Sequence, residues 1–144
     1  MDREIIAKAE QIVASKTGGI GEGDGYCVLA VIDEKGYPTA STVSISKAEG
    51  IRWLTFCVER DGNKARRAGE CGRGSVCVNS PEYNITLVGT LKVLDDADVK
   101  KEMWYEGLEH QFSGPDDPNY CVLRFDTERY SLFVDGVSVA GVPE

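Results

Sequence analysis

The sequence predicts a mainly β protein, a β-barrel with flanking helices. About seven stretches are rich in β-branched and aromatic residues or alternate between apolar and polar residues, as strands do. Most of these stretches are separated only by short turn-forming segments, which favours an antiparallel sheet. About seven strands in one domain of 144 residues favour closure of that sheet into a barrel, with helices over its ends or gaps.

The chain is expected to form a single domain. Its parts are an N-terminal helix at 1–16, a flexible loop at 17–25 and a barrel core at 26–135, within the whole span 1–144. The helix is amphipathic, because Ile5, Ala9 and Val13 recur at helical spacing. The glycine-rich loop follows a helix and precedes a strand, and it lacks the GK[ST] ending of a phosphate-binding loop, so it is interpreted as a linker.

The barrel core is divided by its turn signals into strands and two more helices. The expected strands are 26–32, 37–46, 51–58, 75–79, 83–94, 120–125 and 128–134. The helices are expected at 63–71 and from 97 to about 109, and residues 113–119 form a loop. Gly89, in the middle of the longest expected strand, indicates a bulge or a sharp bend.

The charge distribution limits the possible partners. The net charge of −8 argues against a general nucleic-acid binder, since phosphate contacts need clustered basic residues. Residues 60–73 are locally basic, with five basic and two acidic side chains, a local charge of +3. This patch is either a solvated helix face or a site for a small anionic ligand.

The cysteines and the apolar runs point to a cytoplasmic protein. The five cysteines are an odd number without a CxxC pair and fall mostly in apolar stretches, which suits free thiols in a reducing cytoplasm. The N-terminus is charged and lacks the apolar segment of a signal peptide. The longest apolar run, 26–32, is far too short to span a membrane, so no membrane partner is expected.

Several catalytic mechanisms lack the residues they require. His110 is the single histidine, no GxSxG serine motif occurs, and the cysteines are too widely spaced for a zinc site, so no metal is expected. No candidate for a catalytic residue emerges. Any redox chemistry would therefore come from a cofactor that the protein binds and orients.

Residues 51–64 are the stretch best suited to bind such a cofactor. They form a strand that ends at a breaker, Asp61-Gly62, after which a helix is expected to begin near Asn63. The free N–H groups at a helix start, with Lys64 beside them, can bind a phosphate.

Several strings along the chain resemble the FMN-binding split barrels of the pyridoxamine 5′-phosphate oxidase-like family, in particular its general stress protein branch. The strings are Leu29-Ala30-Val31-Ile32-Asp33 with Gly36-Tyr37-Pro38, Leu54-Thr55-Phe56, Asn63-Lys64, Val88-Gly89-Thr90, and Trp104 with Phe112-Ser113-Gly114-Pro115-Asp116-Asp117-Pro118. The resemblance covers roughly residues 26–134. It implies a split-barrel homodimer with FMN in each of two clefts at the subunit interface.

The resemblance also implies which residues contact FMN. By position these are Ala40, Ser41, Thr42 and Val43 on one strand, Thr55, Phe56 and Cys57 on the next, and Asn63 and Lys64 at the helix start. Two departures weaken the phosphate site: Ser41 stands where relatives often carry an arginine, and Gly62 replaces the serine of a Ser-x-Lys motif. Arg66 or Arg67 could replace the missing phosphate ligand. Asp61, as the N-cap of the helix, would instead bind the backbone N–H groups that the phosphate needs.

These features leave three functions open. The leading one is an FMN-dependent oxidoreductase whose substrate the sequence does not define. The second is a stress-related protein that binds flavin or another ligand without turnover and has a degenerate phosphate site. The third is a related pocket for haem or a deazaflavin, for which His110 is the one histidine that could be an axial ligand.

Overall fold

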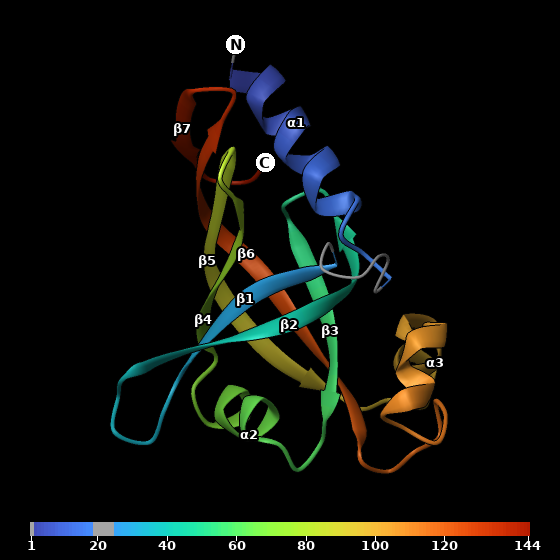
Figure 1. The fold of residues 1–144 in the computed structure, drawn as a ribbon. Helices are drawn as coiled ribbons and strands as arrows, with labels where there is room; N and C mark the ends of the chain where they lie inside the picture. The colour runs from blue at the N-terminus through green and yellow to red at the C-terminus, as the bar shows by residue number, and fades with distance from the viewer. Residues whose placement is uncertain (1, 19–24) are drawn as a thin grey trace.

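The computed structural model describes residues 2–18 and 25–144 and contains seven antiparallel strands in one sheet (Figure 1). The strands are β1 (Tyr26–Ile32), β2 (Pro38–Glu49), β3 (Trp53–Glu59), β4 (Arg73–Ser80), β5 (Tyr83–Leu94), β6 (Tyr120–Val134) and β7 (Val137–Gly141). The helices are α1 (Asp2–Ala14), α2 (Asn63–Glu70), α3 (Ala97–Met103) and the 3-10 helix η1 (Glu106–His110). The loop expected at 17–25 lies mostly outside the described residues.

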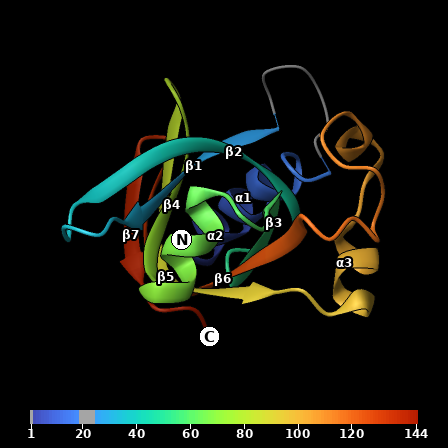
Figure 2. The same cartoon turned by 90° about the horizontal axis from the view of Figure 1, so that it is seen from below.

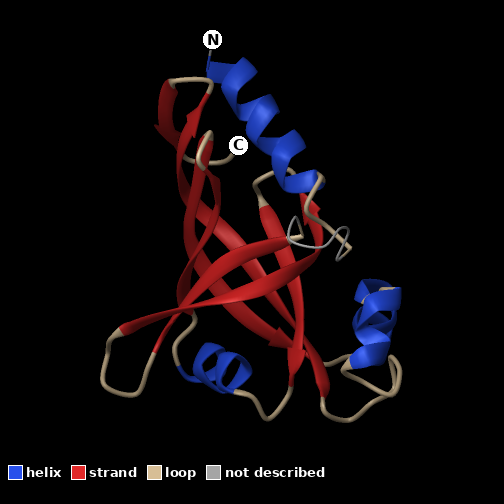
Figure 3. Cartoon of the chain, viewed as in Figure 1, coloured by secondary structure: helices blue, strands red, loops and turns tan. Residues whose placement is uncertain are grey.

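The sheet closes into a barrel through the pairing of β3 with β6. The strand order is β3-β2-β1-β4-β5-β6, and the β3–β6 pairing joins its two ends, while β7 extends β6 as a hairpin. The predicted β-barrel with flanking helices is therefore confirmed. In Figure 3 the helices lie outside the barrel wall, at its two ends and along one side.

Alternating side chains of the strands fill the barrel. Inward-facing residues such as Leu29 and Leu87 are completely buried, and their outward-facing neighbours are partly exposed. Burial of one such side chain contributes about 1.5–3 kcal/mol. The period-two pattern of the sequence thus corresponds to the inside and the outside of the barrel.

Helices α1 and α2 lie at opposite ends of the barrel. The predicted stripe of α1, Ile5, Ala9 and Val13, is buried, and α1 contacts β2, β6 and β7. Seen along the barrel, α2 lies across the opening with α1 behind it (Figure 2). Ala65 and Ala68 of α2 are buried against the core, so the position of the first turn of α2 depends on this packing.

The last two predicted strands form one continuous strand, which corrects the sequence-based division at 125–128. Strand β6 runs without a break from Tyr120 to Val134, and its hairpin partner is β7, which the sequence did not suggest. The turn between them is Asp135-Gly136, where both residues have positive φ (53° and 75°), as a tight hairpin requires. Residues 126–127, which were expected to form a turn between two strands, belong instead to β6, and β6 has a bulge next to them.

This bulge lies opposite Gly89, as the sequence predicted. Gly89 pairs with Thr127 and Val88 with Arg129, so Glu128 is the extra residue on β6. A Cβ at position 89 would lie 1.9 Å from the carbonyl oxygen of Asp126. Only glycine allows the two strands to approach this closely.

We expect Gly89→Ala to destabilise the fold by about 1–3 kcal/mol, because the added methyl group must displace main chain of β6. The free energy of unfolding in urea measures this loss. The matched control is Gly69→Ala on α2, where no atom lies within 4 Å of the added Cβ. An unchanged stability for Gly89→Ala would contradict the close approach.

Candidate functional site

A pocket opens where strands β2 and β3 separate. The two strands pair at Ile45–Phe56 and at two further positions towards Glu49, but over residues 38–44 the described partner of β2 is β1 alone. The pocket has a volume of about 520 Å³. Its lining residues are Tyr26, Val31, Thr39, Ala40, Ser41, Thr42, Val43, Ser44, Cys57, Val58, Glu59, Gly62, Asn63, Lys64, Tyr105, Leu108 and Gln111.

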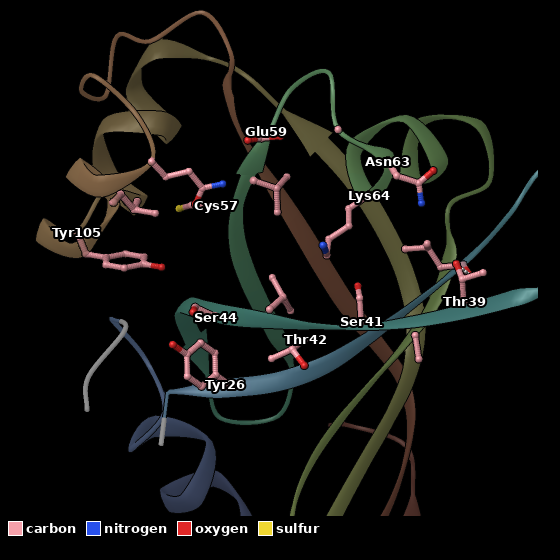
Figure 4. Close-up of a pocket in the computed structure, with 17 residues that line it drawn as sticks. Tyr26, Thr39, Ser41, Thr42, Ser44, Cys57, Glu59, Asn63, Lys64 and Tyr105 are labelled. Atoms are coloured by element: carbon pink, nitrogen blue, oxygen red, sulfur yellow. Dashed lines mark hydrogen bonds between the residues drawn. The ribbon is translucent and has the colours of Figure 1, made fainter. Parts of the chain in front are cut away.

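Most of the predicted contact residues meet in this pocket. Those in its lining are Ala40, Ser41, Thr42, Val43, Cys57, Asn63 and Lys64. Strand β2 and the start of α2, which are about twenty residues apart in the chain, lie on two sides of the same space (Figure 4). The convergence agrees with the prediction that they bind one ligand, and the contacts themselves stay predictions.

Thr55 and Phe56 do not line the pocket. Phe56 points into the barrel and is fully buried. Thr55 is also fully buried, and its Oγ1 accepts a hydrogen bond from the backbone N–H of Lys47 (3.1 Å). Lys47 lies where β2 has one more residue than β3, so Thr55 stabilises the bulge after which the strands separate.

The start of α2 presents uncapped backbone N–H groups beside the pocket. Gly62 is the N-cap and makes no side-chain capping bond, so the competing cap expected from Asp61 does not form. A Cβ at position 62 would lie 3.2 Å from the carbonyl oxygen of Glu59, a close contact that a small shift of the main chain would relieve. The first-turn amides of α2 and Lys64 together form an anion-binding arrangement.

The other basic residues of α2 do not reinforce this arrangement. Arg67 is buried, donates from Nε to the carbonyl oxygen of Ile32 (2.8 Å) and pairs with Glu70, so it cannot replace the missing phosphate ligand. Arg66 is exposed and is not among the lining residues. Within the described lining, Lys64 is the one cation and Glu59 the one anion.

Six polar lining residues were not predicted from the sequence: Tyr26, Thr39, Ser44, Glu59, Tyr105 and Gln111. Tyr105 and Gln111 belong to the segment between β5 and β6, where one helix was expected from 97 to about 109. The helix ends at Met103, and η1 follows only at Glu106. This break places Tyr105 in the pocket wall, and no local signal in the sequence marked it.

Side chains of the sheet bind the C-terminal carbonyl groups of α3. Tyr120 Oη donates to the carbonyl oxygen of Lys100 (2.7 Å). Ser46 Oγ (2.5 Å) and Cys57 Sγ (3.4 Å) donate to that of Met103. These carbonyl groups would otherwise lack partners or continue the helix. The three donors, here called the α3 clasp, end the helix and hold Tyr105 in place.

Burial keeps the phenol of Tyr105 and the thiol of Cys57 protonated. Desolvation raises the pKa of Tyr105 to about 12, and it is the main cause of the raised pKa of Cys57. At neutral pH both groups are therefore uncharged. Cys57 is a hydrogen-bonding thiol, and nothing in its surroundings activates it as a nucleophile.

Other kinds of site find no support in the described residues. In this part of the chain no group of three or more His, Cys, Asp or Glu side chains is placed to bind a metal ion. His110 is exposed and does not line the pocket. Across residues 2–18 and 25–144, no helix is both long enough and apolar enough to cross a membrane.

The protein-family model described as pyridoxamine 5′-phosphate oxidase matches residues 21–133, most of the chain. The chain belongs to the pyridoxamine 5′-phosphate oxidase family. It is 26% identical over 123 residues to general stress protein 26 of Bacillus subtilis (strain 168), covering 76% of this chain and 87% of that protein. The predicted resemblance to this family and to its general stress protein branch is confirmed.

Several solved structures share the fold of this chain. A protein related to general stress protein 26 from Clostridium acetobutylicum has a TM-score of 0.82 at 20% identity, over 99% of this chain and 96% of that one. A pyridoxamine 5′-phosphate oxidase-related, FMN-binding protein from Nostoc punctiforme has a TM-score of 0.63 at 15% identity, over 99% and 94%. A heme-binding protein from Mycobacterium smegmatis has a TM-score of 0.70 at 16% identity, over 95% and 57%.

The loop before β6 is held by one carboxylate, that of Asp117. It accepts hydrogen bonds from the backbone N–H groups of Ser113 (3.0 Å) and Asn119 (2.9 Å), and these bonds lower its pKa below the ordinary value of 3.8. The main-chain carbonyl of Asp117 also accepts a bond from Lys100 of α3 (3.0 Å). The loop thus supports the segment that carries Tyr105.

We expect Asp117→Asn to lower the thermal midpoint of unfolding at pH 7. Because the folded pKa is depressed, the ionised carboxylate stabilises the fold above pH 3.8, and this contribution disappears as the pH falls through the folded value. The difference between variant and parent should therefore shrink in acid. Asp116→Asn, at an exposed neighbouring carboxylate, is the control. A difference that persists at low pH would contradict this role.

Proposed function

We propose that this family member binds FMN in the pocket between β2 and β3. The observation that carries the proposal is the convergence of Lys64, the uncapped start of α2 and the exposed part of β2 on one space. A volume of about 520 Å³ is within the usual range of small-molecule sites. A structural neighbour described as FMN-binding supports the same cofactor.

The residues present fit a phosphate-bearing cofactor. Backbone N–H groups of α2 and the Lys64 ammonium would bind the phosphate, and the hydroxyls of Thr39 and Ser41 lie on the same side of the pocket (Figure 4). Val43 and Cys57 would face the ring system. When bound, FMN supplies hydride transfer, and the chain acts as an oxidoreductase for which no residue is assigned as catalytic.

The same proposal includes a homodimer with the pockets at the interface. The first five residues of β2, 38–42, are exposed, and among the described residues no strand pairs with the edge of this length that faces the pocket. Tyr26 and Tyr37 are exposed by 50% and 66% on either side of it. An open edge with exposed aromatic side chains is well suited to being covered by a second copy.

We expect the protein to elute as a dimer in size-exclusion chromatography with light scattering. Thr42→Lys, on the exposed part of β2, should shift the protein towards the monomer, because it introduces a charge into the expected interface. Lys92→Glu on β5, away from the pocket, is a control for a change of surface charge. A parent protein that is monomeric at micromolar concentration contradicts the dimer.

A second function is favoured by the charges in the pocket. Glu59 faces the same space as Lys64, and Ser41 and Gly62 supply no additional cation. A protein that binds flavin weakly, or another ligand, without turnover agrees with this balance. For haem, the described lining contains no histidine, and His110 is exposed outside the pocket.

The five free cysteines support the proposal that the protein works in the reducing cytoplasm.

We expect purified protein to bind FMN with a flavin absorbance spectrum, and Lys64→Ala to weaken binding about 10–100-fold. The reason is that a charge-assisted hydrogen bond contributes about 1.5–3 kcal/mol. Fluorescence titration with FMN measures both. Arg66→Ala, at an exposed basic residue on the same helix, should bind as the parent does. A protein that takes up no added FMN would overturn the proposal.

A further inference from the structure

Arg67 of α2 is a buried cation that takes no direct part in the proposed binding site. Its side chain is 5% exposed and does not line the pocket, whereas the neighbouring Arg66 is exposed. Arginine is rarely buried unless its charge is paired and its N–H groups are bonded. The bonds that Arg67 makes therefore indicate what its burial achieves.

These bonds fasten α2 to the end of strand β1. Nε of Arg67 donates to the main-chain carbonyl oxygen of Ile32, the last residue of β1 (2.8 Å). Nη1 lies 2.5 Å from the carboxylate of Glu70 on the same helix and 3.9 Å from that of Glu34, in the turn after β1. Because a guanidinium group donates in several directions, this one side chain joins the helix, the strand and the turn.

The end of β1 is also part of the pocket wall. Val31, next to Ile32, lines the pocket, and its carbonyl oxygen accepts a hydrogen bond from the hydroxyl of Thr39 on β2 (3.2 Å). Lys64 precedes Arg67 by three residues on α2 and points into the space in front of β2 (Figure 4). Arg67 therefore links the helix that carries Lys64 to the two strands on the other side of the pocket.

Position, and not charge, is what Arg67 contributes to the phosphate end. Glu70 and Glu34 neutralise its charge locally. The other two buried residues of α2 are Ala65 and Ala68, whose small side chains define the orientation of a short helix only weakly. A hydrogen bond from a backbone N–H group weakens steeply when its distance or angle changes. A shift of α2 would therefore impair the first-turn amides as phosphate ligands.

We propose that Arg67 is a positioning residue that holds the first turn of α2 where its N–H groups and Lys64 can bind a phosphate. The ligands concerned are inorganic phosphate and phosphate monoesters. The inference rests on the proposed function because it concerns the same phosphate end, but it does not require a flavin. Loss of Arg67 removes only the part of the affinity that the phosphate contributes.

Titrations of the whole protein with FMN, riboflavin and inorganic phosphate test this role. FMN and riboflavin differ only in the phosphate, so the ratio of their dissociation constants measures its contribution, and the amide NMR shifts of α2 report on inorganic phosphate. Arg67→Met keeps the side-chain stem and removes every donor. It should weaken the binding of FMN and of inorganic phosphate about tenfold and leave riboflavin binding unchanged.

Two further variants separate positioning from other effects. Arg67→Lys restores one charged donor, which cannot bond Ile32 and Glu70 as a guanidinium does, so it should recover only part of the loss. Arg66→Met, at the exposed neighbour, is the matched control and should bind all three ligands as the parent does.

The outcomes distinguish this role from the proposed function. Equal losses of FMN and riboflavin affinity in Arg67→Met, or no loss of either, would overturn the positioning role and leave FMN binding standing. If Arg67→Met does not fold, a parent-like ratio in Arg67→Lys overturns it. A parent that binds inorganic phosphate in an Arg67-dependent way but takes up no FMN contradicts the proposed function and supports the role of Arg67. A parent that binds neither FMN nor inorganic phosphate overturns both.

Discussion

The candidate site depends on the point at which β2 and β3 stop pairing. The bulge at Lys47, stabilised by the Thr55 hydroxyl, comes just before that point. Beyond it β2 stays with β1 and β3 stays with β6, which closes the barrel while leaving a gap between the first pair. Complete pairing would satisfy the strand edges and remove the pocket. The barrel therefore lacks a few ladder hydrogen bonds where the pocket opens.

The two ends of this gap are built by different means. At one end α2 is packed over the barrel opening, so the main chain of Asn63 and Lys64 supplies the anion-binding groups. At the other end a helical segment is fastened to the outside of the sheet by the α3 clasp, so side chains supply neutral donors. The difference in charge between the ends favours a ligand that is anionic at one end only.

Sequence patterns predicted the features that depend on neighbouring residues. Alternation along the strands, the glycine opposite the bulge and the breaker before α2 were all correctly interpreted, because pleat, close approach and helix initiation are local constraints. The length of α3 was wrong because its last carbonyl groups are bound by Ser46 and Tyr120 from distant strands. The division of β6 was wrong because Asp126-Thr127 continues the strand through a bulge.

By itself, the sequence determined the family, the barrel and the lysine at the start of α2. Only the tertiary structure decided which side chains face the gap. Phe56 points into the core, Arg67 is bound to the carbonyl oxygen of Ile32, and Tyr105 enters the pocket. The reason is that periodicity assigns a residue to a face, whereas barrel closure and the α3 clasp determine which faces meet across a cavity.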